Sequence, residues 1–467
     1  MRMKYNISKL ALICLGLLAV IFSSCKKLVE LDAPVNKIDA STAYTTDATA
    51  TAAIGALYSY GIYTTFSTWL STLSLYGGIS SDELHYTLTA TPTITEIENN
   101  FITTANVTNG TFWSSAYSEL LVANAAITGI GNSTTLTPSV KSQLLGEAKF
   151  FRAFVNFYLV NYYGGVPLTG SDPLTSAYLP RSASAEVYAS IISDLKEAQS
   201  LLPVSYVGTL KARVNQHAAT ALLARVYLYQ KDYVNAEAMA TTVIGSGTYT
   251  LAATNSVFIN TSTETILQFA TYYGFSAVGT SYRTASAAVN VAPPTYTLTS
   301  TIANSFDAGD NRKVNWVDST VSGTKFYRIN KYKIYNTATP AGGNEFNVIL
   351  RLAEQYLIRA EARAQQNNLT GATSDINVIR TRAGLANLSL TATASQTAML
   401  AAIAKERKVE LFGELGHRWL DLVRTGQANT VLSAMKPTTW NATRSVLFPI
   451  PDQQVQQNPA LTQNPGY

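Results

Sequence analysis

Apolar residues recur with a helical period over most of this chain, and the clearest case lies at residues 139–163. Apolar side chains there occupy nearly the whole circumference of the predicted helix, which is typical of a buried helix. Pro138 stands just inside its start, where a missing N–H costs no hydrogen bond, and Gly164 and Gly165 follow its end. The same kind of pattern predicts helices near residues 48–63, 113–130 and 184–202.

Two segments 136 residues apart share one pattern of helix, tight turn and second helix. The matched positions are Ala224 with Ala360, Tyr233 with Leu369, Ala236 with Ala372, and Val243 with Ile379. The small residues stand where two helices of a hairpin touch, as in the tetratricopeptide repeat of ~34 residues. Chance similarity between two alanine-rich helices is the alternative, and the shared turn length favours the repeat.

Two segments lack this helical period, about 76–106 and about 247–347. The second holds the run 324–335, whose β-branched and aromatic residues predict a strand. A long segment without helices inside a compact domain is usually functional or carries short strands of its own. The sequence therefore predicts a mainly α fold. Its helical scaffold covers about 48–75, 110–246 and 348–425, and a loop-rich, partly β face covers about 76–109 and 247–347.

The first 25 residues have the layout of a secretory signal. Arg2, Lys4 and Lys9 precede an apolar run at residues 10–22, which ends at Ser23-Ser24-Cys25. This ending resembles a bacterial lipobox, in which the cysteine is acylated and becomes the new N-terminus. An uncut membrane anchor is the alternative, but the run is shorter than the ~20 residues of a comfortable span.

On this interpretation residues 1–24 are a signal peptide, residues 25–47 a lipidated tether, and residues 48–467 one domain. The chain has 34 basic and 29 acidic residues, and three of the basic ones leave with the signal. A nearly neutral mature chain argues against a nucleic-acid partner. The only cysteines are Cys14 and Cys25, so the mature chain has neither a disulfide nor a cysteine metal site.

The densest charge cluster lies at residues 405–426. Arg407, Glu410 and Glu414 are spaced to share one helix face, and His417, Arg418, Asp421 and Arg424 follow them. Two carboxylates facing a cleft would suit a glycoside hydrolase. The alternative is a buried ion-pair network with Trp419 packed beneath it. We favour the network, because neither a nucleophile nor a His–x–x–x–His zinc pair accompanies the carboxylates.

Other motifs give no sign of catalysis or of a cofactor. The sequence lacks the Gly-x-Ser-x-Gly elbow, the P-loop and the dinucleotide fingerprint. His85 beside Asp82 and Glu83 fits either a base with an orienting partner or a solvated loop. The segment 307–312 has too few oxygen ligands for a calcium site. We therefore expect a binding protein without cofactor or metal.

Aromatic residues gather in the two segments that lack helical period. Flat rings pack on sugar C–H faces while polar side chains bond the hydroxyls. The candidate ligand-binding residues are Tyr76, Asp82, Tyr86, Tyr272, Tyr273, Tyr282, Arg283, Tyr296 and Trp316.

Several segments together resemble the SusD/RagB outer-membrane lipoproteins of Bacteroidetes. They are residues 146–153, 162–168, 218–236, 351–362, 375–384, 406–426, 447–451 and 463–467, with the lipobox at the start. The resemblance implies a right-handed scaffold of tetratricopeptide-like helix pairs with a loop-rich ligand face. It also implies a TonB-dependent SusC-like barrel as partner, and capture of glycans, or sometimes peptides, without cleavage.

We therefore expect a lipid-anchored protein of the outer membrane, facing the cell surface, that captures oligosaccharide and delivers it to a SusC-like transporter. A secreted glycoside hydrolase, a peptide-binding member of the same family and a purely structural lipoprotein are the alternatives.

Replacing the proposed lipid attachment residue tests the anchor. Cys25→Ala is expected to release the protein from membranes or to leave an uncut precursor, because no other thiol follows the apolar run. Membrane fractionation with a mass measurement distinguishes the forms. Normal processing and retention of this variant would contradict the assignment.

Overall fold

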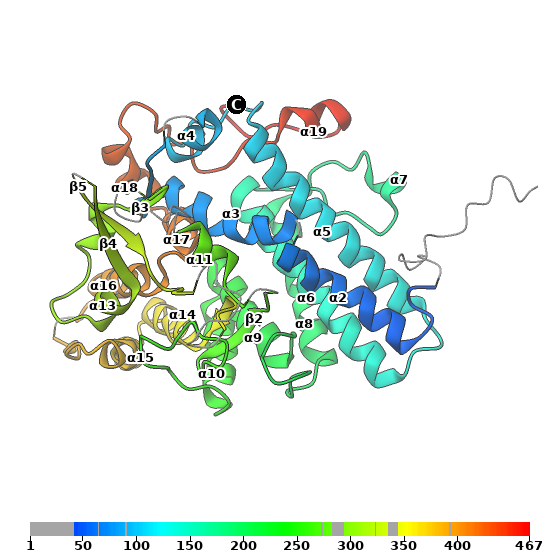
Figure 1. Ribbon diagram of the computed structural model, residues 1–467, viewed down its shortest axis with the longest axis horizontal. Coiled ribbons are helices and arrows are strands. Elements are labelled where there is room, and N and C mark those ends of the chain that lie inside the picture. Colours follow the sequence, from blue (N-terminus) through cyan, green and yellow to red (C-terminus); the bar gives the residue numbers. More distant parts are fainter. Residues whose placement is uncertain are drawn as a thin grey trace, which may run out of the picture.

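Helices make up most of the described chain and two small sheets complete it (Figure 1). The structure is a computed structural model that describes residues 42–63, 65–88, 91–271, 274–282, 294–322, 324–334, 344–391 and 394–467. This arrangement confirms the mainly α class that the apolar pattern predicts.

The longer helices are α2 (Asp47–Tyr63), α3 (Thr65–Ser80), α5 (Val107–Asn132), α6 (Pro138–Tyr163), α8 (Ser184–Leu201), α9 (Gln216–Tyr229), α10 (Tyr233–Gly245), α14 (Leu352–Gln365), α15 (Leu369–Arg382) and α16 (Gln396–Leu411). The shorter ones are α4 (Pro92–Glu98), α7 (Pro173–Ser176), α11 (Ala277–Ser281), α12 (Ser300–Ala303), α13 (Asn311–Trp316), α17 (His417–Arg424), α18 (Ala428–Met435) and α19 (Asp452–Gln457). The strands are β1 (Leu84–Tyr86), β2 (Thr265–Phe269), β3 (Tyr296–Leu298), β4 (Val317–Ser322), β5 (Thr324–Ile329) and β6 (Asn347–Arg351).

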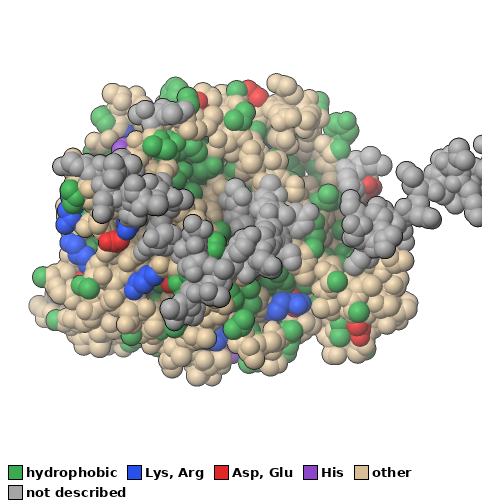
Figure 2. Space-filling view, in the orientation of Figure 1, with side chains coloured by type: hydrophobic (Ala, Val, Ile, Leu, Met, Phe, Trp, Pro, Cys, Tyr) green, Lys and Arg blue, Asp and Glu red, His purple; other side chains and the backbone are tan. Residues whose placement is uncertain are grey.

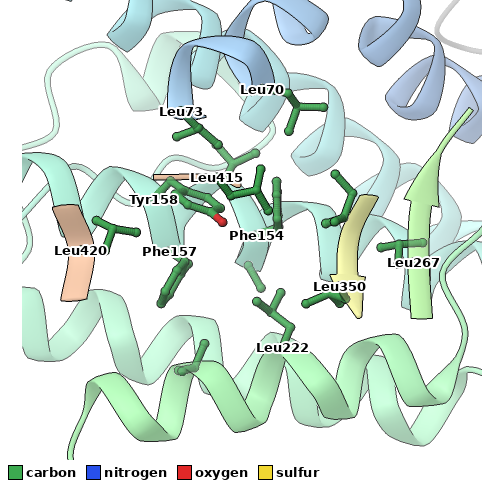
Figure 3. Close-up of a cluster of buried hydrophobic side chains, with 14 of the residues drawn as sticks. Leu70, Leu73, Phe154, Phe157, Tyr158, Leu222, Leu267, Leu350, Leu415 and Leu420 are labelled. Carbon is green, nitrogen blue, oxygen red and sulfur yellow. The ribbon is translucent and has the colours of Figure 1, made fainter. Parts of the chain in front are cut away.

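Helix α6 is the centre of the core. Most of its side chains from Leu144 onward are buried, as its apolar circumference predicts. Figure 3 shows Phe154, Phe157 and Tyr158 of this helix among leucines from α3, α9, β2, β6 and α17. Segments from both halves of the chain therefore depend on one helix for their apolar contacts.

The two predicted hairpins are α9–α10 and α14–α15, and they match residue for residue. Lys231 and Asn367 occupy the same place in the turns, with φ of 60° and 61°. The side chains of Asp232 and Asn368 then accept hydrogen bonds from the backbone N–H three residues on. Helix α10 packs against α14, so the hairpins stack, and the predicted repeat is confirmed.

The long segment between the hairpins carries the strands that its composition predicts. Strand β2 pairs antiparallel with β6, where Phe269 lies opposite Asn347. The second sheet has the strand order β1-β3-β5-β4. Its first strand comes from the other predicted non-helical segment, so the sheet joins two parts of the chain that are about 210 residues apart.

The start of the first non-helical segment was predicted too early. Helix α3 continues through Tyr76 to Ser80, and the seven-residue helix α4 follows within the same segment. Two adjacent glycines such as Gly77 and Gly78 commonly mark the end of a helix. In the structure a Cβ on Gly77 would lie 2.5 Å from the Cα of Gly416. The glycine is therefore required for a close approach between α3 and the turn before α17, and does not end the helix.

The charge cluster near residue 410 is a buried ionic network, as favoured from the sequence. Glu410 is fully buried and lies 2.6 Å from Arg351 Nη1 and 3.0 Å from Arg312 Nη1, and it also contacts Arg382. Glu414 lies 2.7 Å from Arg351 Nε and 2.5 Å from Lys331 Nζ. The network ties β6, α13, α15 and the segment after β5 to α16.

The expectation that Arg407, Glu410 and Glu414 share one helix face was wrong. Helix α16 ends at Leu411, and Glu414 lies in the following turn. Arg407 instead points to a second network, where its Nε lies 2.8 Å from Asp421. Trp419 is fully buried.

Removing one partner tests whether the first network is structural. Glu410→Ala leaves three cationic side chains without this carboxylate, and breaking a buried pair costs about 3–5 kcal/mol. We expect a large fall in the free energy of unfolding, measured by chemical denaturation.

Glu197→Ala is the control, because Glu197 is half exposed and pairs with Lys149 at 3.0 Å. A pair of this kind contributes at most about 1 kcal/mol. Equal effects of the two substitutions would contradict a structural role for the buried network.

Candidate functional site

The structure brings Tyr76, Tyr86 and Tyr296 together from α3, β1 and β3. Tyr86 lies directly opposite Tyr296 in the antiparallel pair, with ring centroids 5.4 Å apart and tilted by 42°. Tyr76 packs edge-on against Phe112 at 5.9 Å. Burial raises the pKa of Tyr76 to about 12. Burial, and then repulsion from Tyr76, Tyr86 and Glu98, also raises the pKa of Tyr296. The three rings thus form one cluster, in which Tyr86 is only 7% exposed and belongs to the apolar core, while Tyr76 and Tyr296 are half-buried against that core.

A glutamate that the sequence did not suggest completes this cluster. Glu98 Oε1, on α4, lies 2.7 Å from His85 Nδ1 and accepts a hydrogen bond of 3.1 Å from Tyr86 N. The His85 side chain is 59% exposed, and its hydrogen bond to Glu98 raises its pKa. His85 is therefore oriented by Glu98 of α4, and not by Asp82 or Glu83, the partners considered in one of the two interpretations of the sequence.

The neighbouring strands extend the surface with side chains that were not predicted as ligands. Leu298 of β3 lies opposite Tyr327 of β5. Lys325 Nζ lies 5.0 Å from the Tyr327 ring centroid, and Arg328 forms an ion pair with Asp318 at 2.5 Å. Charged side chains are sparse on the face in Figure 2, and several basic ones lie at its left edge, over β4 and β5.

Asp82 lies close to this cluster in sequence but points into the protein. It is 1% exposed, and both of its oxygens contact Arg418, at 2.6 and 2.8 Å. The next residue, Glu83, accepts a hydrogen bond of 2.9 Å from Gly413 N. These two carboxylates attach β1 to α17 and to the turn before it, so Asp82 positions the strand and does not face a ligand in this structure.

Tyr282 and Trp316 are also buried. The Tyr282 hydroxyl donates a hydrogen bond of 2.8 Å to the Gly413 carbonyl, and Trp316 Nε1 donates one of 2.5 Å to the Thr254 carbonyl. The indole of Trp316 packs over Lys331 Nζ at 4.6 Å and Arg382 at 5.4 Å. Trp316 therefore covers the buried ionic network, and its ring is not available for stacking on a ligand.

The other predicted site residues, Tyr272, Tyr273 and Arg283, lie outside the described residues, as does Cys25. Among the described residues, no group of three or more histidine, cysteine or carboxylate side chains is placed to hold a metal ion. Within the same part of the chain, no helix has the length and apolar character needed to span a membrane.

The carboxylates considered for hydrolysis are engaged in ion pairs. Glu410 and Glu414 are buried in the first network. For Asp421, burial alone would raise the pKa, but Arg407 and Arg424 lower it below its usual range. A glycoside hydrolase needs a carboxylic acid with a raised pKa next to a second carboxylate in a cleft. Asp421 does not have that property.

Two family models match this chain, one over each half. The model described as "Starch-binding associating with outer membrane" matches residues 52–228, and the model described as "SusD family" matches residues 266–467. The chain belongs to the SusD/RagB family. Two SusD-like proteins of Formosa agariphila resemble this SusD/RagB protein along its length. One is 25% identical and covers 99% of both chains; the other is 27% identical over 76% of this chain and 80% of its own.

Solved structures agree with the fold of this SusD/RagB protein. A SusD superfamily protein from Bacteroides vulgatus has a TM-score of 0.77 at 20% identity, covering 90% of this chain and all but 1% of its own. A structure named as a laminarin-binding SusD-like protein has a TM-score of 0.73 at 26% identity, covering 91% and 100%. A surface glycan-binding protein from Bacteroides fluxus has a TM-score of 0.73 at 23% identity, with the same coverage.

Glu83 gives the attachment of β1 in this SusD/RagB protein a dependence on pH. Burial raises its pKa to about 7, from an ordinary value of 4.5. Because the pKa of Glu83 is higher in the folded chain than in the unfolded chain, folding favours the protonated carboxyl. The stabilisation is complete below pH 4.5 and is lost as the pH rises toward 7. Between these values the protein should lose stability relative to Glu83→Gln, which cannot titrate, by ~1.4 kcal/mol per unit of pKa difference.

Denaturant unfolding of both proteins at several values between pH 4.5 and 7.5 measures this difference. A constant difference across the range would show that Glu83 has the same pKa in the folded and unfolded chains.

Proposed function

We propose that this protein captures oligosaccharide at the cell surface, with the tyrosine cluster of β1 and β3 as part of its binding surface. The observation that carries the proposal is the half-buried Tyr296 ring, which strand pairing holds against the buried ring of Tyr86, with Glu98 nearby. Rigid rings beside hydrogen-bonding side chains suit sugars, whose C–H faces pack on rings while their hydroxyls bond polar groups.

The relatives support a glycan as the ligand. One structural neighbour is named as binding laminarin and another is named a surface glycan-binding protein, and one of the two family descriptions names starch. We therefore propose binding without cleavage. A peptide ligand remains the alternative from the family resemblance, and a glycoside hydrolase is disfavoured because Glu410, Glu414 and Asp421 are held in ion pairs.

We further propose that acyl chains on Cys25 anchor the protein to the outer membrane and that a SusC-like TonB-dependent barrel receives the oligosaccharide. The signal and lipobox pattern supports the anchor, and the family description mentions association with the outer membrane. The barrel partner rests on the family resemblance. Co-purification of such a barrel from solubilised outer membranes would support it, and its absence would count against it.

A substitution in the tyrosine pair tests the binding surface. Tyr296→Ala removes the half-buried ring, the member of the pair that a ligand can reach, and a stacked ring contributes roughly 0.5–1.5 kcal/mol beyond area burial. We therefore expect laminarin oligosaccharides, or whichever glycan of a panel binds the parent, to bind roughly two- to tenfold more weakly in calorimetric titration.

Tyr178→Ala is the matched control, because Tyr178 is 67% exposed and belongs to neither sheet. Melting temperatures of both variants separate lost affinity from lost stability. Unchanged glycan affinity in a folded Tyr296→Ala protein would place the binding surface elsewhere. New reducing ends during incubation would contradict binding without cleavage.

A further inference from the structure

The loop between α8 and α9 presents apolar side chains to solvent. Val204, Val207 and Leu210 are 50%, 47% and 38% exposed, whereas Tyr206 and Lys211 are half-buried. Gly208, between the exposed side chains, has a φ of 80° and open space around the position of a Cβ, so the loop projects from the surface. Single exposed apolar residues are common on proteins, but three within seven residues form a patch that needs an explanation.

The polar side chains of the loop face inward and hold it against β2. The Tyr206 hydroxyl donates a hydrogen bond of 2.7 Å to the Ile266 carbonyl, and Gln268 Nε2, on the same strand, donates one of 2.5 Å to the Leu210 carbonyl. Lys211 Nζ donates a hydrogen bond of 3.1 Å to a carbonyl just before β2. The apolar side chains are therefore held outward by a fixed backbone, and ordering them on binding costs little conformational freedom.

The end of the loop contacts α2, the first helix of the domain. Val214 N donates a hydrogen bond of 3.0 Å to the Tyr58 hydroxyl, and the Arg213 guanidinium lies 5.0 Å from the centroid of the same ring. Asp47 begins α2 eleven residues before Tyr58, which is ~16 Å along the helix axis. The proposed lipidated tether, residues 25–47, ends at this helix start. The loop therefore lies on the part of the domain to which the tether connects.

Charge and size favour a lipid surface over a protein as the partner of this loop. The sequence has no aspartate or glutamate between Glu197 and Asp232, so this segment offers no carboxylate for anionic headgroups to repel. Three partly exposed aliphatic side chains offer on the order of 200 Å² of apolar area, whereas a stable protein interface buries ~800 Å² on each partner. A few apolar side chains on a projecting loop can instead enter the boundary between headgroups and acyl chains.

We propose that Val204, Val207 and Leu210 enter the surface of the lipid bilayer to which the protein is anchored. The inference rests on the proposed acylation of Cys25, which brings the domain to the bilayer. An acyl anchor alone leaves the domain free to rotate about its tether. The loop adds a second contact, which fixes the side of the domain that faces the lipid.

A tryptophan at the tip of the loop tests the contact. The full acylated protein is reconstituted into vesicles of phosphatidylethanolamine and phosphatidylglycerol with brominated acyl chains, which quench indole fluorescence on contact. Val207→Trp should be quenched at least twofold more strongly than Val234→Trp, after subtraction of the parent signal. Val234 is the matched control, because it is a 66% exposed valine on α10. Equal quenching of the two variants would overturn the proposal.

A second pair of variants tests whether the exposed side chains act together. In a Val204→Trp protein, Leu210→Asp places a charge on the patch and should reduce quenching at least twofold. Val234→Asp in the same protein should leave quenching unchanged. Equal effects of the two aspartates would contradict insertion of the loop. Melting temperatures confirm that each variant is folded.

Two further measurements keep this proposal separate from the proposed function. The mass of the purified protein shows whether Cys25 is acylated, so a missing anchor is recognised independently of the quenching. Glycan titration of Val207→Trp should match that of the parent, because the loop contributes no residue to the tyrosine cluster. Quenching absent in vesicles, together with a blue-shifted Val207→Trp emission in native outer membranes, would overturn the lipid contact in favour of a protein partner.

Discussion

The buried guanidinium of Arg351 is the constraint on which the other parts of the molecule depend. It contacts Glu264 just before β2, Glu410 on α16 and Glu414 in the turn before α17, all within 2.9 Å. A charge this deep is tolerated only when all its partners are present. The second hairpin, the two-stranded sheet and the C-terminal helices must therefore assemble together.

The same network fixes the surface that carries the tyrosines. Lys331, two residues after β5, donates to Glu414 and to the Glu410 carbonyl, and Trp316, just before β4, covers it. Burial lowers the pKa of Lys331 to about 8. The carboxylates of Glu414 and Glu410 oppose this shift and keep the ammonium group charged near neutral pH. The β4–β5 hairpin is thus attached at both ends to the ionic core, and Asp82 and Glu83 attach β1 in the same way. The sheet is a rigid extension of the scaffold.

Local patterns predicted the scaffold well because the residues that determine each helical hairpin lie within that hairpin. The turn residues at 231 and 367 and the small residues at helix contacts lie within a few residues of what they determine. Orientation of the aromatic residues was not predictable in this way. Trp316 and Tyr296 both lie in the long segment without helical period, yet Trp316 covers buried cations and Tyr296 pairs with Tyr86 in the sheet. Asp82 was misjudged because its partner, Arg418, lies 336 residues away.

The pairing of β2 with β6 means that the chain leaves the scaffold and returns to it at one place, since Phe269 and Asn347 are direct neighbours. Whatever lies between these two residues begins and ends at a fixed point, and closing a longer excursion costs only a logarithmic increase in entropy. Changes of length between them are therefore tolerated best away from Arg312, Trp316 and Lys331, which belong to the buried ionic network of the scaffold. Such a junction lets recognition diversify quickly while the framework that supports it stays the same.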